Sequence, residues 1–263
     1  MKITALVENE SNCELKAKHG LSLYIETPKY KILFDVGPDN TLFANSRMRG
    51  IDLSEIDIVI LSHGHMDHGG TLEQFLKVNH TAKVYAQRKA FEKHYSKLLF
   101  FKVNVGVDPS LQIHPQVILL DGDYKIDDEL MLFTVPNTER YYSSANDVLY
   151  TDTGKDNFSH EQNLMVLGDA NVLITGCGHA GVVNILEKAA KHRPQVCVGG
   201  YHLFNPLTRK TVSSDLLEGI AQELKKYDIR YYTCHCTGQK AYRYLSERLA
   251  NMHYLSCGET IKI

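Results

Sequence analysis

Three histidines and one aspartate fall within six positions of the chain, in the segment VILSHGHMDHGG at residues 59–70. They are His63, His65, Asp67 and His68. Neutral imidazole and carboxylate groups are the ligands that zinc takes in proteins, and iron and manganese accept them too. Four such groups are costly to bury without a metal ion or a dense hydrogen-bond network. The segment therefore predicts a metal site, and the alternative of a solvated loop is disfavoured by its flanking elements.

Those flanking elements place the cluster at the end of a buried strand. The aliphatic run at 56–62 predicts a strand, and apolar residues at helical spacing within 69–78 predict a helix. Side chains two positions apart in an extended segment point to the same side, so His63 and His65 are expected to face one point at the sheet edge. Asp67 and His68 follow as the chain turns into the helix, where two glycines permit a tight backbone.

The whole chain has the composition of an average globular protein. It has 263 residues, 43% of them hydrophobic and 23% charged, with a formal charge of −2. This small negative charge gives no overall electrostatic attraction to nucleic acid or to an anionic membrane. We find neither a transmembrane stretch nor a signal peptide, so the six cysteines are interpreted as reduced thiols. We expect a soluble cytoplasmic protein with a small-molecule substrate and no nucleic-acid or membrane partner.

Strands and helices are predicted in both halves of the chain. Expected strands lie at 3–8, 21–27, 31–37, 56–62, 83–86, 116–121, 130–136, 163–169, 171–176, 195–200 and 229–234. Expected helices lie at 41–50, 69–78, 181–192, 213–227 with Ser213 or Ser214 as N-cap, and 237–250 with Thr237 as a possible cap. Two β-rich halves with covering helices predict an α/β fold, a four-layer αββα sandwich, as one domain over 1–263. Residues 88–115 have no clear pattern and are interpreted as an insertion that covers a site or as a surface excursion.

The motif SHGHMDHGG resembles the His-x-His-x-Asp-His signature of the metallo-β-lactamase superfamily. The upstream KILFDVG is similar to that family's first motif, which implies that Asp35 braces the site instead of binding a metal; a plain turn residue is the alternative. Four more stretches, KHGLSLYIET, TGCGHAGVVNIL, VGGYHL and CHCTGQKA, narrow the match. They resemble a branch of metal-dependent hydrolase-like proteins that includes an archaeal 7,8-dihydropterin-6-methyl-4-(β-D-ribofuranosyl)-aminobenzene-5′-phosphate synthase.

The resemblance implies a ligand set for two divalent ions, with zinc preferred and iron or manganese as alternatives. The superfamily's third histidine is expected near FTVPNTERYY at 133–142, which contains none. We interpret His179 as taking this role, although a histidine at a strand-helix junction could also be a capping or hydrogen-bonding group, and we interpret His235 as the last ligand. By position, one metal would have His63, His65 and His179. The other would have Asp67, His68 and His235.

Further residues are placed near the site by the same resemblance. Cys177 stands where a bridging aspartate is expected, and its thiolate could bind a metal or its small side chain could merely line the cavity. His202 is expected beside the site as a ligand's hydrogen-bond donor, a substrate contact or an alternative ligand, and His19 could approach it. Cys234 and Cys236 are expected to point away from His235 and to pack. Six more histidines are expected at the surface: His80, His94, His114, His160, His192 and His253.

The resemblance implies hydrolysis of an ester, lactone, thioester or phosphoester. Two ions that share a water lower its pKa towards neutrality, and Asp67 would be both ligand and proton acceptor. A transferase like the dihydropterin synthase is an alternative, in which the metals would help a diphosphate depart. A di-iron redox protein and a non-catalytic metal-binding sensor are further alternatives. A nuclease is disfavoured by the lack of basic surface, and a β-lactamase by the lack of a signal peptide.

Overall fold

The computed structural model describes residues 1–98, 100–136 and 140–263. The chain forms two compact units, each with its own sheet. The first unit comprises Met1–Tyr95, Asn104–Asp121 and Leu255–Ile263, and the second comprises Ser96–Val103 and Gly122–Tyr254. The single domain over 1–263 stays a prediction.

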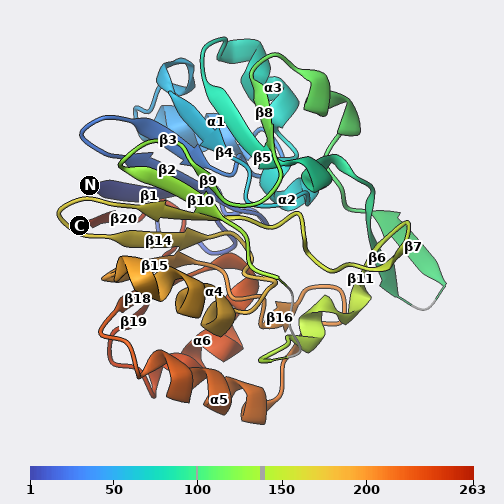
Figure 1. Cartoon of the computed structure of the whole chain (residues 1–263), viewed down its shortest axis with the longest axis vertical. Coiled ribbons are helices and arrows are strands. Elements are labelled where there is room, and N and C mark those ends of the chain that lie inside the picture. Colours follow the sequence, from blue (N-terminus) through green and yellow to red (C-terminus); the bar gives the residue numbers. More distant parts are fainter. Residues whose placement is uncertain (99, 137–139) are drawn as a thin grey trace. The chain divides into compact units, whose positions relative to one another are not determined.

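The sheet of the first unit has seven strands in the order β20-β1-β2-β3-β4-β5-β8 (Figure 1). The strands are β1 (Lys2–Val7), β2 (Ser22–Glu26), β3 (Lys31–Phe34), β4 (Ile58–Ile60), β5 (Lys83–Gln87), β8 (Val117–Leu120) and β20 (Thr260–Lys262). β20, β1, β2 and β3 pair antiparallel, whereas β3, β4, β5 and β8 pair parallel. After Lys31, the parallel strands β3 and β4 consist of buried apolar residues, as expected of strands buried on both faces.

Three helices belong to the first unit: α1 (Thr41–Met48), α2 (Met66–Gly69) and α3 (Leu72–Val78). Leu42 of α1 and Phe75 of α3 lie in one buried core with side chains of β3, β4 and β5. Apolar residues at helical spacing therefore attach α1 and α3 to the sheet, and the short α2 follows the loop after β4.

The start of α1 is stabilised by Asp39. The Asp39 carboxylate accepts a hydrogen bond from the Thr41 amide at 2.9 Å and pairs with Lys18 Nζ at 2.8 Å. Burial alone would raise the pKa of Asp39, but these groups lower it to about 2. Asp39→Ala should therefore lower the free energy of unfolding by about 0.5–1 kcal/mol at pH 7. Because the folded pKa lies below the unfolded one, this contribution is complete above pH 4 and is lost as the pH falls towards 2.

Urea unfolding of wild type and Asp39→Ala at pH 7, 5 and 3 measures this effect. The stability difference between the two proteins should shrink at pH 3. Asp169→Ala, at an exposed turn residue, is the matched control. A difference that is the same at pH 7 and pH 3 would show that the Asp39 charge has no part in it.

The sheet of the second unit has the order β19-β18-β15-β14-β13-β10-β9 (Figure 1). Its strands are β9 (Tyr124–Lys125), β10 (Leu130–Phe133), β13 (Asn163–Val166), β14 (Val172–Thr175), β15 (Val196–Gly199), β18 (Arg230–Thr233) and β19 (Met252–Tyr254). β14, β15, β18 and β19 are parallel. Thr175, Gly199 and Thr233 pair across neighbouring strands, so three strands end at the same edge of the sheet.

The helices of this unit are α4 (Val182–Ala189), α5 (Ser214–Leu224) and α6 (Gln239–Ser246), and their apolar faces share one core with the sheet. Ser213 is the N-cap of α5, since its hydroxyl accepts from the Leu216 amide at 3.3 Å. The predicted Thr237 cap is wrong. Gly238, at φ 74°, precedes α6, and the Thr237 hydroxyl instead accepts from the Tyr201 amide at 2.9 Å.

Residues 88–115 contain more regular structure than their sequence indicates. Strands β6 (His94–Leu98) and β7 (Phe101–Asn104) join β11 (Leu149–Thr151) and β12 (Gly154–Lys155) in a four-stranded sheet. A short hairpin pairs β16 (Phe204–Asn205) with β17 (Lys210–Thr211). The role of 88–115 as a cover over a site stays a prediction. Within the described ranges, every helix is too short or too polar to cross a bilayer.

Candidate metal centre

The first unit gathers three buried imidazoles after β4. The ring centroid of His63 lies 4.6 Å from that of His65 and 4.2 Å from that of His68. His63 and His65 lie in the loop after β4, and His68 lies on α2. The predicted cluster is thus a compact set of side chains that comes from a strand end and the helix after it.

Asp35 is the group that orients this set. It is fully buried directly after β3, and it accepts from the Ser62 amide at 2.7 Å, the Ser62 hydroxyl at 2.7 Å and His68 Nδ1 at 2.6 Å. A carboxylate can only accept, so His68 carries its proton on Nδ1 and presents Nε2 as a lone pair. Asp35 therefore braces a histidine, as the sequence resemblance implied.

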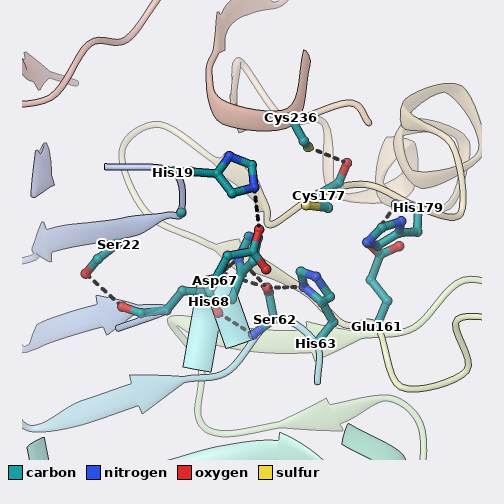
Figure 2. A network of polar contacts seen from close by, with 12 residues as sticks. His19, Ser22, Ser62, His63, Asp67, His68, Glu161, Cys177, His179 and Cys236 are labelled. Atoms are coloured by element: carbon teal, nitrogen blue, oxygen red, sulfur yellow. Dashed lines mark hydrogen bonds and ion pairs between the residues drawn. The ribbon is translucent and has the colours of Figure 1, made fainter. Parts of the chain in front are cut away.

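Ser62 extends the same bracing to His63 (Figure 2). Its hydroxyl donates to Asp35, so its oxygen is left to accept from His63 Nδ1 at 2.8 Å. His63 then also carries its proton on Nδ1 and has its lone pair on Nε2. A carboxylate that fixes the tautomer of a histidine in this way is the usual arrangement behind metal-ligating imidazoles.

Asp67 lies beside His68 and is the most accessible member of the cluster. Its Oδ2 is 3.9 Å from His68 Nε2 and 3.4 Å from His19 Nε2 (Figure 2), and the side chain is 23% exposed. The backbone also ties the two segments, because the Leu21 amide donates to the Asp67 carbonyl at 3.1 Å. A Cβ on Gly20 would lie 2.5 Å from that carbonyl, so the approach requires glycine. His19 thus contacts Asp67 of the cluster.

The second unit gathers its own donors at the shared end of β14, β15 and β18. One ligand atom each from Cys177, His179 and His202 lies within 4.8 Å of the others, and the same holds for Cys177, His235 and Cys236. All five side chains are buried. Cys177 belongs to both groups, so the five residues form a continuous set.

Hydrogen bonds and a stacked ring fix the position of His179. Its Nδ1 donates to Asn146 Oδ1 at 2.8 Å, and Asn146 Nδ2 donates back to the His179 carbonyl at 3.0 Å. The Phe158 ring stacks on the imidazole at 4.3 Å. Glu161 accepts from the His179 amide at 2.7 Å and the Ala180 amide at 3.0 Å (Figure 2). Since Nδ1 is the donor, Nε2 is again the available lone pair.

Glu161 and Cys236, both beside the candidate ligands, have shifted pKa values. Burial raises the pKa of Glu161 to about 7, against the opposing effect of its two amide donors. Burial would also raise the pKa of the Cys236 thiol. The neighbouring Cys177 and His202, together with the nearby His235, instead hold the Cys236 pKa well below its ordinary value. Burial therefore dominates at Glu161, whereas the neighbouring side chains dominate at Cys236.

Asp35 and two of the candidate ligands have unusual backbone conformations. Asp35 (φ 62°), His202 (φ 46°) and His235 (φ 50°) lie in the left-handed region. Aspartate and histidine adopt this region more often than most residues, but at some energetic cost. Strain of this kind is concentrated at functional sites, and here it falls on a brace and two candidate ligands.

Three predictions about individual residues are wrong in their geometry. Cys236 does not point away from His235, because the two begin a 3-10 turn (η6, His235–Thr237) in which strand alternation no longer holds. His94 and His160 are buried instead of lying at the surface. The His94 ring lies 5.6 Å from that of His65, and His160 Nε2 lies 3.2 Å from Asp156 Oδ2.

Sequence reasoning missed the residues that hold the ligands: Ser62, Asn146, Phe158 and Glu161. Ser62 directly precedes the histidine motif, and its hydroxyl group could have indicated a hydrogen-bond partner for the histidines. The other three lie far from His179 in sequence, and their residue types are common in loops. Residues 137–139 of the stretch in which a third histidine was sought lie outside the described residues.

These donor sets fit a metal ion. Imidazoles with Nε2 lone pairs, a carboxylate and thiols are metal ligands by their chemistry, and each is buried or nearly so in a built environment. Burying so many polar nitrogen and sulfur atoms close together without a metal ion would cost free energy, because their hydrogen bonds to water are lost.

The sequence matches the model of the metallo-β-lactamase superfamily over residues 16–232, and the chain belongs to that superfamily. It is 30% identical to an uncharacterized protein of Methanocaldococcus jannaschii, with 99% of this chain and all of that protein covered. It is 26% identical to the 7,8-dihydropterin-6-methyl-4-(β-D-ribofuranosyl)-aminobenzene-5′-phosphate synthase of the same organism, with 100% and 96% covered.

Among solved structures, the chain is similar to Tm1679, a metal-dependent hydrolase of the β-lactamase superfamily. The TM-score is 0.83 at 26% identity, with 100% of this chain and 99% of that chain covered. The predicted family and α/β fold class are thereby confirmed. The protein is a metal-dependent hydrolase-like member of the superfamily, with buried histidine, aspartate and cysteine clusters suited to metal ions.

Proposed function

We propose that the protein is a hydrolase that uses two divalent ions, zinc in the first place, on a small phosphorylated or ester substrate. The observation that carries the proposal is the pair of imidazoles, His63 and His68, whose Nε2 lone pairs are fixed by the Asp35–Ser62 network beside the carboxylate of Asp67. A network with only a structural role would give these histidines hydrogen-bond partners. It would not need to place their lone pairs next to an accessible carboxylate.

The residues that would hold metal ions are His63, His65, Asp67 and His68 in the first unit and His179 and His235 in the second. When bound, such ions polarise an ester or phosphoryl oxygen and lower the pKa of water. Both carboxylate oxygens of Asp35 accept hydrogen bonds from Ser62 or His68. The side chains of Ser62 and His68 are therefore held in place when a substrate binds. Asp67 is partly exposed, so its carboxylate can accept a proton from an incoming water.

A transferase that acts on a pterin phosphate is the second candidate. It is supported by 26% identity to the dihydropterin synthase over the whole of this chain. In that reaction the same ligands would favour departure of a diphosphate instead of attack by water. The two candidates therefore differ in the acceptor, and a substrate comparison can separate them.

The test combines metal content with turnover. The protein, purified without added metal, should contain close to two equivalents of zinc per chain, and it should hydrolyse chromogenic phosphoesters or esters. A chelator should abolish turnover, and zinc should restore it. Asp67→Asn should lower kcat by about 100- to 1,000-fold, since a proton acceptor contributes on that order. His253→Gln, at an exposed histidine, is the control and should keep full activity.

Other results would redirect the assignment. Condensation of a dihydropterin diphosphate with a ribofuranosyl-aminobenzene phosphate, without ester hydrolysis, would establish the transferase. Two equivalents of iron with redox activity would favour the redox alternative. Failure to bind metal after reconstitution would overturn the proposal and leave a non-catalytic binding protein.

A further inference from the structure

We infer that Cys177 and Cys236, together with His235 and His202, form a sulfur-containing metal site that selects zinc-like ions over hard ions such as Mg²⁺ and Mn²⁺. The inference rests on the proposed metal-dependent function and names the class of metal. It uses residues of the second unit alone. It also assigns Cys236 a ligand role, which its position in the sequence does not suggest.

The geometry of the donor atoms suits a single ion. Sulfur atoms of Cys177 and Cys236 and a ring nitrogen of His235 lie within 4.8 Å of one another. A ring nitrogen of His202 lies within the same distance of the Cys177 sulfur. Zinc bonds sulfur at about 2.3 Å and imidazole at about 2.0 Å in a tetrahedron, which needs neighbouring donor atoms about 3.5–4 Å apart. A small contraction of Cys177, Cys236 and His235 would provide three positions of this tetrahedron, and His202 lies beside the Cys177 sulfur as the fourth donor.

The backbone holds the Cys236 sulfur towards Cys177. A Cβ on Gly200 would lie 2.5 Å from that sulfur and 3.6 Å from Cys177 Cα, so the absence of a side chain at 200 provides its space. The His202 amide donates to the sulfur at 3.3 Å. Amide N–H groups aimed at sulfur stabilise the thiolate over the thiol, which is the form that binds a metal.

His202 provides the second, independent observation. It is 7% exposed, and neither of its ring nitrogens makes a hydrogen bond to any residue that the structure describes. Buried imidazoles normally have hydrogen-bond partners, so a nearby ion explains this one. If the two cysteines were simple packing residues, His202 would be left with two unsatisfied nitrogens.

The chemistry of the set determines the ion. Thiolate sulfur is a soft donor that favours zinc and similar ions, whereas Mg²⁺ and Mn²⁺ favour oxygen. The Cys236 thiol donates to the Cys177 carbonyl at 3.4 Å, and it would release that proton to solvent when the sulfur binds the ion.

Cobalt(II) substitution tests this inference. Metal-free protein under reducing conditions is titrated with Co²⁺, and the near-ultraviolet sulfur-to-cobalt charge-transfer band is recorded. Wild type should show the band, Cys177→Ser and Cys236→Ser should each lower its intensity, and the double variant should lose it. Cys197→Ser changes a buried cysteine of the same sheet that lies 4.0 Å from the Tyr201 hydroxyl, and it should keep the full band. Zinc should displace Co²⁺, and a large excess of Mn²⁺ should not.

Cobalt that binds without a sulfur band, or a band unchanged in Cys236→Ser, would overturn the inference. If the serine variants fail to fold, X-ray absorption of the wild-type zinc protein decides, because sulfur neighbours at about 2.3 Å are distinct from nitrogen and oxygen. The readout is independent of turnover. A sulfur band in a protein without hydrolase activity would reject the proposed function alone, and turnover without sulfur ligation would reject this site alone.

Discussion

Asp35→Ala is expected to weaken metal binding by about 10- to 100-fold and to lower the free energy of unfolding by about 3 kcal/mol. The carboxylate accepts three hydrogen bonds in a fully buried position. Without it, the Ser62 amide and the His68 Nδ1 proton lose their acceptor, and His63 loses the serine orientation that fixes its tautomer. Zinc affinity measured by chelator competition and urea unfolding of the metal-free protein test both effects.

Two comparisons separate orientation of the ligands from general loss of stability. Asp35→Asn keeps one acceptor oxygen but introduces an N–H₂ group, so it should recover part of the stability and little of the metal affinity. Asp57→Ala removes an exposed carboxylate that accepts from the Lys31 amide in the same unit, and it should leave metal affinity unchanged. Wild-type zinc affinity in Asp35→Ala would show that Asp35 does not orient the ligands.

Glu161→Ala is expected to lower metal affinity by about tenfold and the free energy of unfolding by about 2–4 kcal/mol. The substitution leaves two buried amide N–H groups, those of His179 and Ala180, without their acceptor, and each costs about 1–3 kcal/mol. It also releases the loop that carries His179. Titration of zinc into the metal-free variant and its thermal unfolding measure the two effects.

The pH dependence of the metal-free protein adds a second readout. Because burial raises the pKa of Glu161 from 4.5 to about 7, the folded state holds the proton more tightly than the unfolded state does. The wild-type protein should therefore lose stability relative to Glu161→Gln as the pH rises from 4.5 to 7. Glu187→Ala, at an exposed glutamate paired with Arg140, is the control and should have neither effect. A pH-independent difference between wild type and Glu161→Gln would contradict the assigned titration.

Much of the fold and four of the six proposed ligands could be predicted from local signals. Aliphatic runs indicate strands, and His63, His65, Asp67 and His68 are neighbours in the chain, so their convergence follows from one strand end. The partners of His179 could not be found in this way. Asn146 and Glu161 lie 33 and 18 residues away and contact it because loops beyond the sheet bring them there.

Cys236 shows a different limit of pattern reasoning. Alternation along an extended strand assigns neighbours to opposite faces, but this rule ends where the strand ends. His235 adopts a positive φ and begins a 3-10 turn, which places the next side chain on the same side as Cys177. The buried His94 and His160 were missed for a related reason, since neither lies in a segment whose periodicity indicates burial.

For a chain that binds metal as proposed, the left-handed backbone at Asp35, His202 and His235 would link the lifetime of the protein to the supply of metal. Each such residue costs about 1–3 kcal/mol, which is a large share of the net stability of a domain. An ion that binds only the folded chain offsets this cost by mass action. Under metal starvation the chain would spend more time unfolded, so cellular proteases would remove it when it has no ion to use.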